Sequence, residues 1–463
     1  MTGVRAPAAA GAAPWREARP TTARPRSVTR LHATLPRWAG HLALAVLLLA
    51  GLGLAVGATH GGYTVDTASA ATPRWIDGPL RTPGQVLGGL TPGTWSLALT
   101  VMLVSYLVIF ACARALSPRT VWITIALANG VFLLAPTLVS TDVFGYVSYA
   151  RLAVLHGLNP YLNAPISVPH DALLGLVYWR HATTPYGPLF TLATYPLALV
   201  TPWLAVWTLK AAAAVAAIGL AAVVSRLAAR RGADPVRAAV LVGLNPVILV
   251  YAVSGAHNDL EATLVVALGL SVAAAGRQGR GAALLVAGAA IKVTAGLALP
   301  FLVMGSRRPR AALTAGAGAV LVVAALTTAL FGTHVLDQLR RISSDPVFDI
   351  AGSGPARLGG LLGTGIDTTV RAACTGAAGI VLLIELARVR RGADWIACAG
   401  WATLALMGAI ASFAPWYVVW LAPLAALGRS RRLTVAALMV SAYVVAIHLT
   451  WLGGAPWLSG PND

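Results

Sequence analysis

Charged side chains are scarce in this sequence. Only 11% of its 463 residues are charged, 57% are apolar, and the mean hydropathy is +0.75. A soluble domain carries about 25% charged residues. This deficit excludes a water-facing globular fold. The net charge of +19 would indicate nucleic acid in a soluble protein, but here we expect no such partner.

Cysteines are few, and familiar catalytic motifs are absent. Cys112, Cys374 and Cys398 lie in or beside apolar blocks without metal-ligand spacing, so they are interpreted as small apolar residues. The sequence contains no P-loop, zinc motif, nucleophile elbow or DxD pair. These absences argue against ATP-driven pumps, zinc proteases and metal-dependent nucleotide-sugar enzymes. We expect neither a metal nor a cofactor.

Long apolar blocks dominate what is present. Each is roughly 20 residues long, enough to cross a hydrocarbon core of ~30 Å. The blocks lack the alternation of a β-barrel, and helices satisfy their own backbone in lipid. The prediction is an all-α polytopic integral membrane protein with about 11–13 transmembrane helices. Residues 1–38 should form a disordered basic cytoplasmic tail, and 39–463 a single transmembrane domain.

Arginine clusters between the blocks predict which loops face the cytoplasm. Lysine occurs only at Lys210 and Lys292, and the Ala/Gly/Arg/Pro bias suggests a bacterial genome. We therefore expect a bacterial plasma-membrane protein with a cytoplasmic N-terminus. The clusters leave these loops on the outer side: 60–93, 141–185, 254–259, 332–371 and 412–415.

Two segments conflict with simple helix counting. Residues 281–304 lie between two basic clusters, so they must cross an even number of times within 24 residues. Two short half-helices meeting near Lys292 satisfy this requirement, and such breaks occur where they line a polar cavity. Residues 186–225 are interrupted by prolines and are predicted to cross once, after an interfacial or re-entrant piece.

The stretch Ser140–Tyr161 predicts an amphipathic helix at the outer membrane surface. A period of 3.6 places Asp142, Tyr146, Tyr149 and His156 on one face, directed at a lumen. On spacing alone, a capping role is the commoner one for such an aspartate. The other face is apolar and is expected to rest in lipid. It consists of Phe144, Val147, Val154 and Leu155.

Three further stretches place polar or aromatic groups at membrane depth. Gly255–Glu261 is either an ordinary solvated turn or a functional site, because buried ionisable groups are costly. Lys292 is either a phosphate anchor or a lysine that snorkels to the interface. Ser412–Trp420 is either an aromatic belt or a platform for a sugar or prenyl chain. Thr184–Pro188 is interpreted as a structural turn.

These stretches together resemble the GT-C superfamily of polyprenyl-phosphate-sugar-dependent glycosyltransferases. The likeness is greatest to bacterial α-1,6-mannosyltransferases of lipomannan and lipoarabinomannan. Relatives often carry Lys-Pro where this chain has Lys292-Val293, and some carry an acidic pair where only Asp142 stands. The motifs that carry the resemblance are Asp142-Val-Phe-Gly-Tyr146, His156-Gly-Leu-Asn-Pro-Tyr161, His257-Asn-Asp259, and Ala414-Pro-Trp-Tyr417 with Trp420.

The resemblance implies a mannosyl or other hexosyl transfer on the extracytoplasmic side. The donor would be a polyprenyl-phosphate-linked sugar and the acceptor a glycolipid or oligosaccharide. Asp142 would be the general base of an inverting reaction. Lys292, His257 and Arg151 would bind the donor phosphate, in that order of preference. The acceptor or sugar would contact Tyr146, Tyr149, His156, Asn258, Asp259, Trp416 and Tyr417.

Two other classes share the polytopic pattern. A flippase or transporter for lipid-linked saccharides would need a path open to both faces, and ideally an internal repeat, which the sequence does not show. A polymerase or ligase would rely on arginines in outer loops, such as Arg340, Arg341 and Arg357. The gathering of polar residues on the outer side favours the enzyme.

Overall fold

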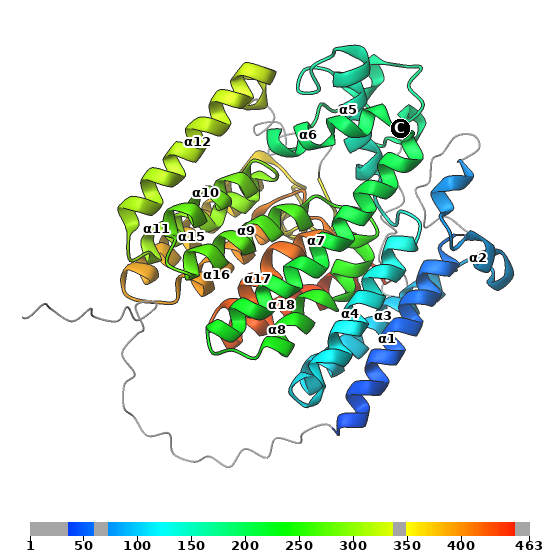
Figure 1. The fold of residues 1–463 in the computed structure, drawn as a ribbon, viewed down its shortest axis with the longest axis horizontal. Coiled ribbons are helices and arrows are strands. Elements are labelled where there is room, and N and C mark those ends of the chain that lie inside the picture. The colour runs from blue at the N-terminus through cyan, green and yellow to red at the C-terminus, as the bar shows by residue number, and fades with distance from the viewer. Residues whose placement is uncertain (1–35, 60–72, 337–348, 450–463) are drawn as a thin grey trace, which may run out of the picture.

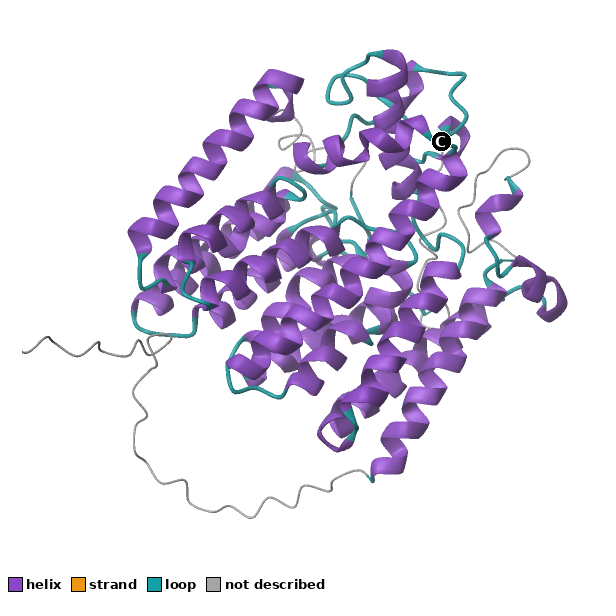
Figure 2. Ribbon diagram, viewed as in Figure 1, coloured by secondary structure: helices purple, strands orange, loops and turns teal. Residues whose placement is uncertain are grey.

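The computed structural model describes residues 36–59, 73–336 and 349–449. Within these ranges the chain forms helices and loops and no strand (Figure 2), which confirms the predicted all-α polytopic class. Most of the predicted basic tail, and both Arg340 and Arg341, lie outside the described residues.

Five helices in the described ranges are long and apolar enough to cross a membrane. They are α1 (Arg37–Gly57), α3 (Pro92–Cys112, continued by η2, Ala113–Ala115), α7 (Pro202–Arg230), α12 (Pro309–Phe331) and α15 (Thr368–Arg390).

The other apolar blocks form shorter helices, several of them extended by a 3₁₀ or π turn. Near the site these are α5 (Asp142–His156), α6 (Pro188–Thr194), η5 (Tyr195–Leu199), η6 (Ile248–Val253, a π-helix), α9 (Asp259–Ala274), α10 (Gln278–Ala289), η7 (Val293–Leu297), η9 (Pro415–Tyr417) and α17 (Val418–Leu427). The remainder are η1 (Arg74–Asp77), α2 (Arg81–Leu87), α4 (Pro118–Leu134), η3 (Pro165–Ser167), η4 (Leu174–Leu176), α8 (Pro235–Gly243), α11 (Ala298–Gly305), α14 (Gly354–Leu362), α16 (Trp395–Ala409) and α18 (Arg431–Ile447).

A repeated local signal explains where several of these helices begin. A Ser, Thr or Asp side chain accepts a backbone N–H of the first turn, and the next residue is proline. Proline suits this position because its fixed φ fits a helix and the first N–H needs no helical partner. The four pairs are Thr91-Pro92, Ser117-Pro118, Thr201-Pro202 and Asp234-Pro235.

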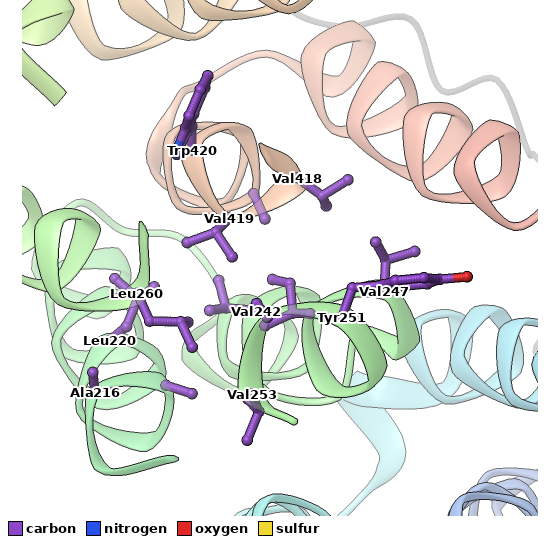
Figure 3. Close-up of a cluster of buried hydrophobic side chains, with 14 of the residues drawn as sticks. Ala216, Leu220, Val242, Val247, Tyr251, Val253, Leu260, Val418, Val419 and Trp420 are labelled. Atoms are coloured by element: carbon purple, nitrogen blue, oxygen red, sulfur yellow. The ribbon is translucent and has the colours of Figure 1, made fainter. Parts of the chain in front are cut away.

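The helices form one bundle in which α7, α8, α9 and α17 lie together at the centre (Figure 1). On one side α1 packs against α3 and α4, and on the other α10 packs against α9 and α12. Apolar side chains of the π-helix η6 fill the space between α7, α8 and α17 (Figure 3). The π-helix is therefore a buried element that leads directly into the polar stretch Gly255–Glu261.

Three of the basic turns meet at one end of the bundle. The Arg231 guanidinium lies 2.8 Å from Asp394 Oδ1, and the backbone N–H of Arg429 donates to Asp394 Oδ2 at 2.8 Å. Asp394 also accepts from the N–H of Ile396 and so caps α16. The α7–α8, α15–α16 and α17–α18 turns thus share a side, as the arginine pattern predicts.

Both predicted irregular segments are confirmed. Residues 281–304 do not form a straight helix, because α10 ends at Ala289 and the chain around Lys292 is extended before η7. Residues 186–225 form the short α6–η5 piece followed by the single long helix α7.

The predicted surface helix is α5, and its bounds agree with the prediction. The expectation that its apolar face rests in lipid is wrong for Phe144 and Val147, which are 0% and 1% exposed within the protein. The Phe144 ring packs edge-on against Trp75 of η1, with 6.3 Å between ring centroids. A segment before α3 covers this face, and only Val154 and Leu155 near the end of α5 stay exposed.

Candidate active site

Four chain segments bring the predicted polar residues together. They are the start of α5, the turn between η6 and α9, the extended residues between α10 and η7, and η9 with the start of α17. Each is an interruption of helix between apolar blocks. Functional side chains gather where backbone irregularity is buried by protein, as membrane proteins require.

Asp142 and His257 form the first of two side-chain pairs. His257 Nδ1 lies 3.4 Å from Asp142 Oδ2, and the two side chains are 0% and 13% exposed. The His257 ring stacks on Trp416 with 3.6 Å between centroids and an interplanar angle of 15°. Asp142 is the first residue of α5 rather than its cap, since Thr141 occupies the cap position. The contact with His257 thus gives this aspartate a partner outside its own helix.

The pKa of Asp142 is lowered from its usual value by these neighbours. Burial by itself raises the pKa of a carboxyl, because it disfavours the charged form. The nearby His257 ring, the charge of Lys292 and the Tyr186 hydroxyl outweigh that effect. The carboxylate is therefore ionised at neutral pH, the form that a general base requires.

A tight turn delivers His257 to this position. After η6, Ala256 adopts φ 53°, and the backbone N–H of His257 returns to Ala252 O at 3.0 Å. A Cβ atom at Gly255 would lie 2.6 Å from Tyr251 O and 2.8 Å from the His257 ring. Only glycine fits here, so the sequence Gly255-Ala-His is what permits the ring to turn inward.

Lys292 and Asp259 form the second pair. Lys292 Nζ lies 3.3 Å from Asp259 Oδ2, and Asp259 is fully buried. Trp420 donates its indole N–H to Asp259 Oδ1 at 2.7 Å. The ammonium group also faces the rings of Tyr186 and Tyr417, at 5.7 and 5.6 Å from their centroids. Two aromatic faces and one carboxylate thus surround the lysine.

Tyr186 is a site residue that the sequence did not reveal. The Thr184–Pro188 turn was interpreted as structural, but the N–H of Gly187 donates to Ile291 O at 3.0 Å, beside Lys292. A Cβ atom at Gly187 would lie 2.1 Å from Ala290 O. Tyr161 also donates its hydroxyl to Tyr186 O at 2.8 Å. An aromatic residue between two prolines, directly after the predicted outer loop 141–185, was the available signal.

The predicted face of α5 divides into two parts. The hydroxyl of Tyr146 accepts the N–H of Asn258 at 3.4 Å, which connects α5 to the His257 turn. Tyr149 donates to Ala182 O at 2.8 Å and so holds the outer loop. The first turns of α5 therefore belong to the polar cluster, together with Asn258 and Asp259.

Arg151 and His156 lie apart from that cluster. Arg151 Nε lies 2.8 Å from Asp171 Oδ2, and His156 Nε2 lies 3.8 Å from the same oxygen. Asp171 further accepts the N–H of Leu173, so this group fixes the loop around η4 to the end of α5. The structure brings the other predicted site residues together, but not these two.

Several buried polar atoms of the cluster have no protein partner among the described residues. An unmet buried polar group is costly, so a polar ligand with several hydroxyl or phosphate oxygens would complement them. Within the same ranges, no three His, Cys, Asp or Glu side chains gather as a metal site. The atoms without a hydrogen bond are both ring nitrogens of His257, of which Nδ1 lies 3.4 Å from Asp142, Asn258 Oδ1 and Nδ2, Glu261 Oε2, Thr294 Oγ1 and Trp416 Nε1.

Two protein families match this chain. The model of the N-terminal domain of alpha-(1->6)-mannopyranosyltransferases matches residues 37–308, which include Asp142, His257 and Lys292. The model of glycosyltransferase family 87 matches residues 184–447, which include Trp416. No solved structure matches the chain.

Curated relatives agree with these families. Alpha-(1->6)-mannopyranosyltransferase A of Mycobacterium tuberculosis is 31% identical over 69% of this chain and 68% of its own length. The protein of the same name from Corynebacterium glutamicum is 31% identical over 37% of this chain and 36% of its own length. A probable alpha-(1->6)-mannopyranosyltransferase of Mycolicibacterium smegmatis is 33% identical over 29% of this chain and 25% of its own length. The chain is a multi-pass membrane glycosyltransferase and belongs to the alpha-(1->6)-mannopyranosyltransferase family.

Proposed function

We propose that this protein transfers a mannosyl residue from a polyprenyl-phosphate-linked donor to a glycolipid or oligosaccharide acceptor, with inversion, on the extracytoplasmic side of the membrane. The observation that carries the proposal is that two side-chain pairs, Asp142–His257 and Lys292–Asp259, lie close together and differ in which partner is exposed. In one pair a carboxylate is the more exposed partner, and in the other an ammonium group is. Such a site offers a base and a cation side by side.

Asp142 is the proposed general base. An acceptor hydroxyl attacks the anomeric carbon of the donor while its proton moves to an Asp142 oxygen. His257 contacts the other side of this carboxylate and fixes its orientation. In this role His257 acts through Asp142 by its Nδ1, while its unpartnered Nε2 remains available to the ligand.

Lys292 is the proposed anchor of the donor phosphate. As the new bond forms, the bond between the anomeric carbon and the phosphate oxygen breaks, and the electron pair leaves on the polyprenyl phosphate. A fixed cation stabilises that developing charge. Lys292 is 16% exposed at its side chain while its carboxylate partner Asp259 is fully buried, so the lysine is the more accessible partner of the pair. Displacement at a β-linked donor gives an α-mannoside.

Aromatic and amide groups around the charges are proposed to bind sugar. Trp416, Tyr417, Tyr146 and Asn258 line the polar cluster, and the remaining hydroxyls of a sugar match its unpartnered atoms. Tyr149 is proposed to hold the loop at the acceptor side. Arg151 and His156 both contact Asp171 and are proposed to affect ligand binding by holding the loop around η4. The chemistry at Asp142 does not require them.

The direct test is an assay with purified protein, a short-chain polyprenyl-phosphate-mannose and a small mannoside acceptor. We expect a product heavier by one hexose in mass spectrometry, with an α-linkage by NMR. GDP-mannose in place of the lipid donor should give no product. Transfer from GDP-mannose, or a β-linked product, would contradict the proposed donor or the inversion.

A further inference from the structure

Lys210 is a buried lysine that plays no part in the reaction proposed above. It lies within α7 and is 1% exposed. Its Nζ donates to two backbone carbonyls, at 2.7 Å to Ser254 O and 3.4 Å to Phe132 O, and it lies 5.5 Å from the centre of the Trp207 ring. Burying such a group is costly, so its position at these two carbonyls requires an explanation.

Both carbonyls lie at the C-terminal ends of helices, α4 and η6. The helical partner of Phe132 O would be the N–H of residue 136, but Pro136 has none. Ser254 is the C-cap of the π-helix η6, and the N–H of Asn258, four residues further on, donates to the Tyr146 hydroxyl and not to Ser254 O. The C-terminal ends of helices carry partial negative charge, so an amine donor stabilises both ends at once.

The two helix ends lead directly to Asp142 and His257. The chain runs from Phe132 at the end of α4 to Asp142, and from Ser254 to His257 three residues later. Each connection contains a non-glycine residue with positive φ, Val139 at 59° and Ala256 at 53°. These are the two such residues in the described ranges. Strained backbone persists only where its surroundings hold it in place.

We propose that Lys210 is a positioning residue that ties the end of α4 to the turn after η6, and so keeps Asp142 and His257 in contact. The inference rests on the proposed role of Asp142 as the base. Lys210 touches neither member of the pair. It acts through the backbone that presents them, from a helix that contributes no other group to the site.

The experiment compares Lys210→Met with wild type and with the control Thr208→Val on the same helix. Thr208 is exposed and its hydroxyl returns to Leu204 O, so its loss should leave activity unchanged. We expect Lys210→Met to lower kcat by about 10²-fold, the cost of a displaced catalytic group. The KM for the donor should stay within about two-fold, because Lys292 is untouched.

The pH profile separates positioning from a general loss of structure. His257 lowers the pKa of Asp142, so a looser contact should move the acidic limb of kcat/KM to higher pH. Lys210→Gln keeps a hydrogen-bond donor. Its kcat and its acidic limb should therefore lie between those of Lys210→Met and those of wild type. In an Asp142→Asn background, Lys210→Met should cause no further loss of residual transfer.

Three results would overturn the inference. The first is a wild-type kcat in folded Lys210→Met. The second is an acidic limb of kcat/KM that stays at the wild-type pH although kcat of Lys210→Met has fallen. The third is a further loss of transfer when Lys210→Met is added to Asp142→Asn. If Lys210→Met does not fold, Lys210→Gln supplies the same readouts, and an unmoved acidic limb there counts against the inference. Failure of wild type to transfer mannose rejects the proposed function instead, which separates the two.

Discussion

The indole of Trp420 donates to Asp259 at 2.7 Å, on the carboxylate whose other oxygen faces Lys292. The aspartate thus has both oxygens engaged inside the protein, whereas the lysine has one carboxylate and two aromatic faces. Lys292 is therefore the partner that is available to a ligand. The pairing also leads to a prediction about stability.

Asp259→Asn and Lys292→Met should each destabilise the protein by about 3 kcal/mol, because each leaves a buried charge without its partner. The double variant should lose much less than the sum, since no charge is then left alone. The side-chain oxygen of Asn can still accept the Trp420 indole N–H. The Asp259→Asn variant therefore tests the ion pair without removing this hydrogen bond. Thermal unfolding in detergent measures the cycle, and strictly additive losses would reject the ion pair.

Lys292→Met should weaken the use of the donor more than the use of the acceptor. The missing cation would have faced the donor phosphate, both in the bound state and as charge develops on the leaving group. Initial rates with each substrate varied in turn provide the test. A larger effect on the acceptor KM would assign Lys292 to the other substrate.

Asp142→Asn should reduce glycosyl transfer by ~10² or more while thermal stability stays near wild type. Asn has almost the same shape but cannot hold a proton taken from the acceptor. Asp142→Glu keeps the charge at a shifted position and should retain a trace of activity. If folded Asp142→Asn transfers mannose at a normal rate, Asp142 is not the base and the proposed mechanism is rejected.

The acidic limb of kcat/KM should lie at low pH in wild type and at higher pH in His257→Asn. A general base is active when deprotonated, and its lowered pKa extends activity toward acid. Removing His257 removes the largest opposing influence, while burial continues to raise the pKa of Asp142. Limbs at the same pH would show that His257 does not act on Asp142.

Single cysteines at His170 and Arg308 test sidedness, in a background where Cys374 is replaced by alanine. Both positions are exposed, while Cys112 and Cys398 are buried. An impermeant thiol reagent added to intact cells should label His170→Cys, and Arg308→Cys only after permeabilisation. The reverse pattern would place Asp142 on the cytoplasmic side and reject the lipid-donor proposal as stated.

The sequence predicted the parts of the site that leave a local signal. The α5 helix was predicted by its period, and the break at Lys292 by the arginine clusters on either side of it. His257 and Asp259 were predicted because polar residues between apolar blocks are rare. The assignment of Phe144 and Val147 to lipid was wrong, because a helix period shows an apolar face but not what covers it.

Other site features depend on contacts that no local pattern encodes. Tyr186 joins the site because a Gly187 without Cβ can meet the broken end of α10. Lys210 finds its carbonyls because Pro136, far away in sequence, leaves one of them free. Asp171 holds Arg151 from a loop without periodicity. Each depends on a distant partner, which a single sequence does not identify.

The separation of 161 positions in sequence between Asp259 and Trp420 has a consequence for biosynthesis. A ribosome that has just completed α10 has placed Asp142, His257 and Asp259 in the nascent chain, but it has not yet made Trp416 or Trp420. Until α17 is inserted, the Asp259 carboxylate lacks its indole donor and the His257 ring lacks its stacking partner. The polar centre of this enzyme is thus completed only near the end of translation, and chains that stop before α17 should be substrates for membrane proteases.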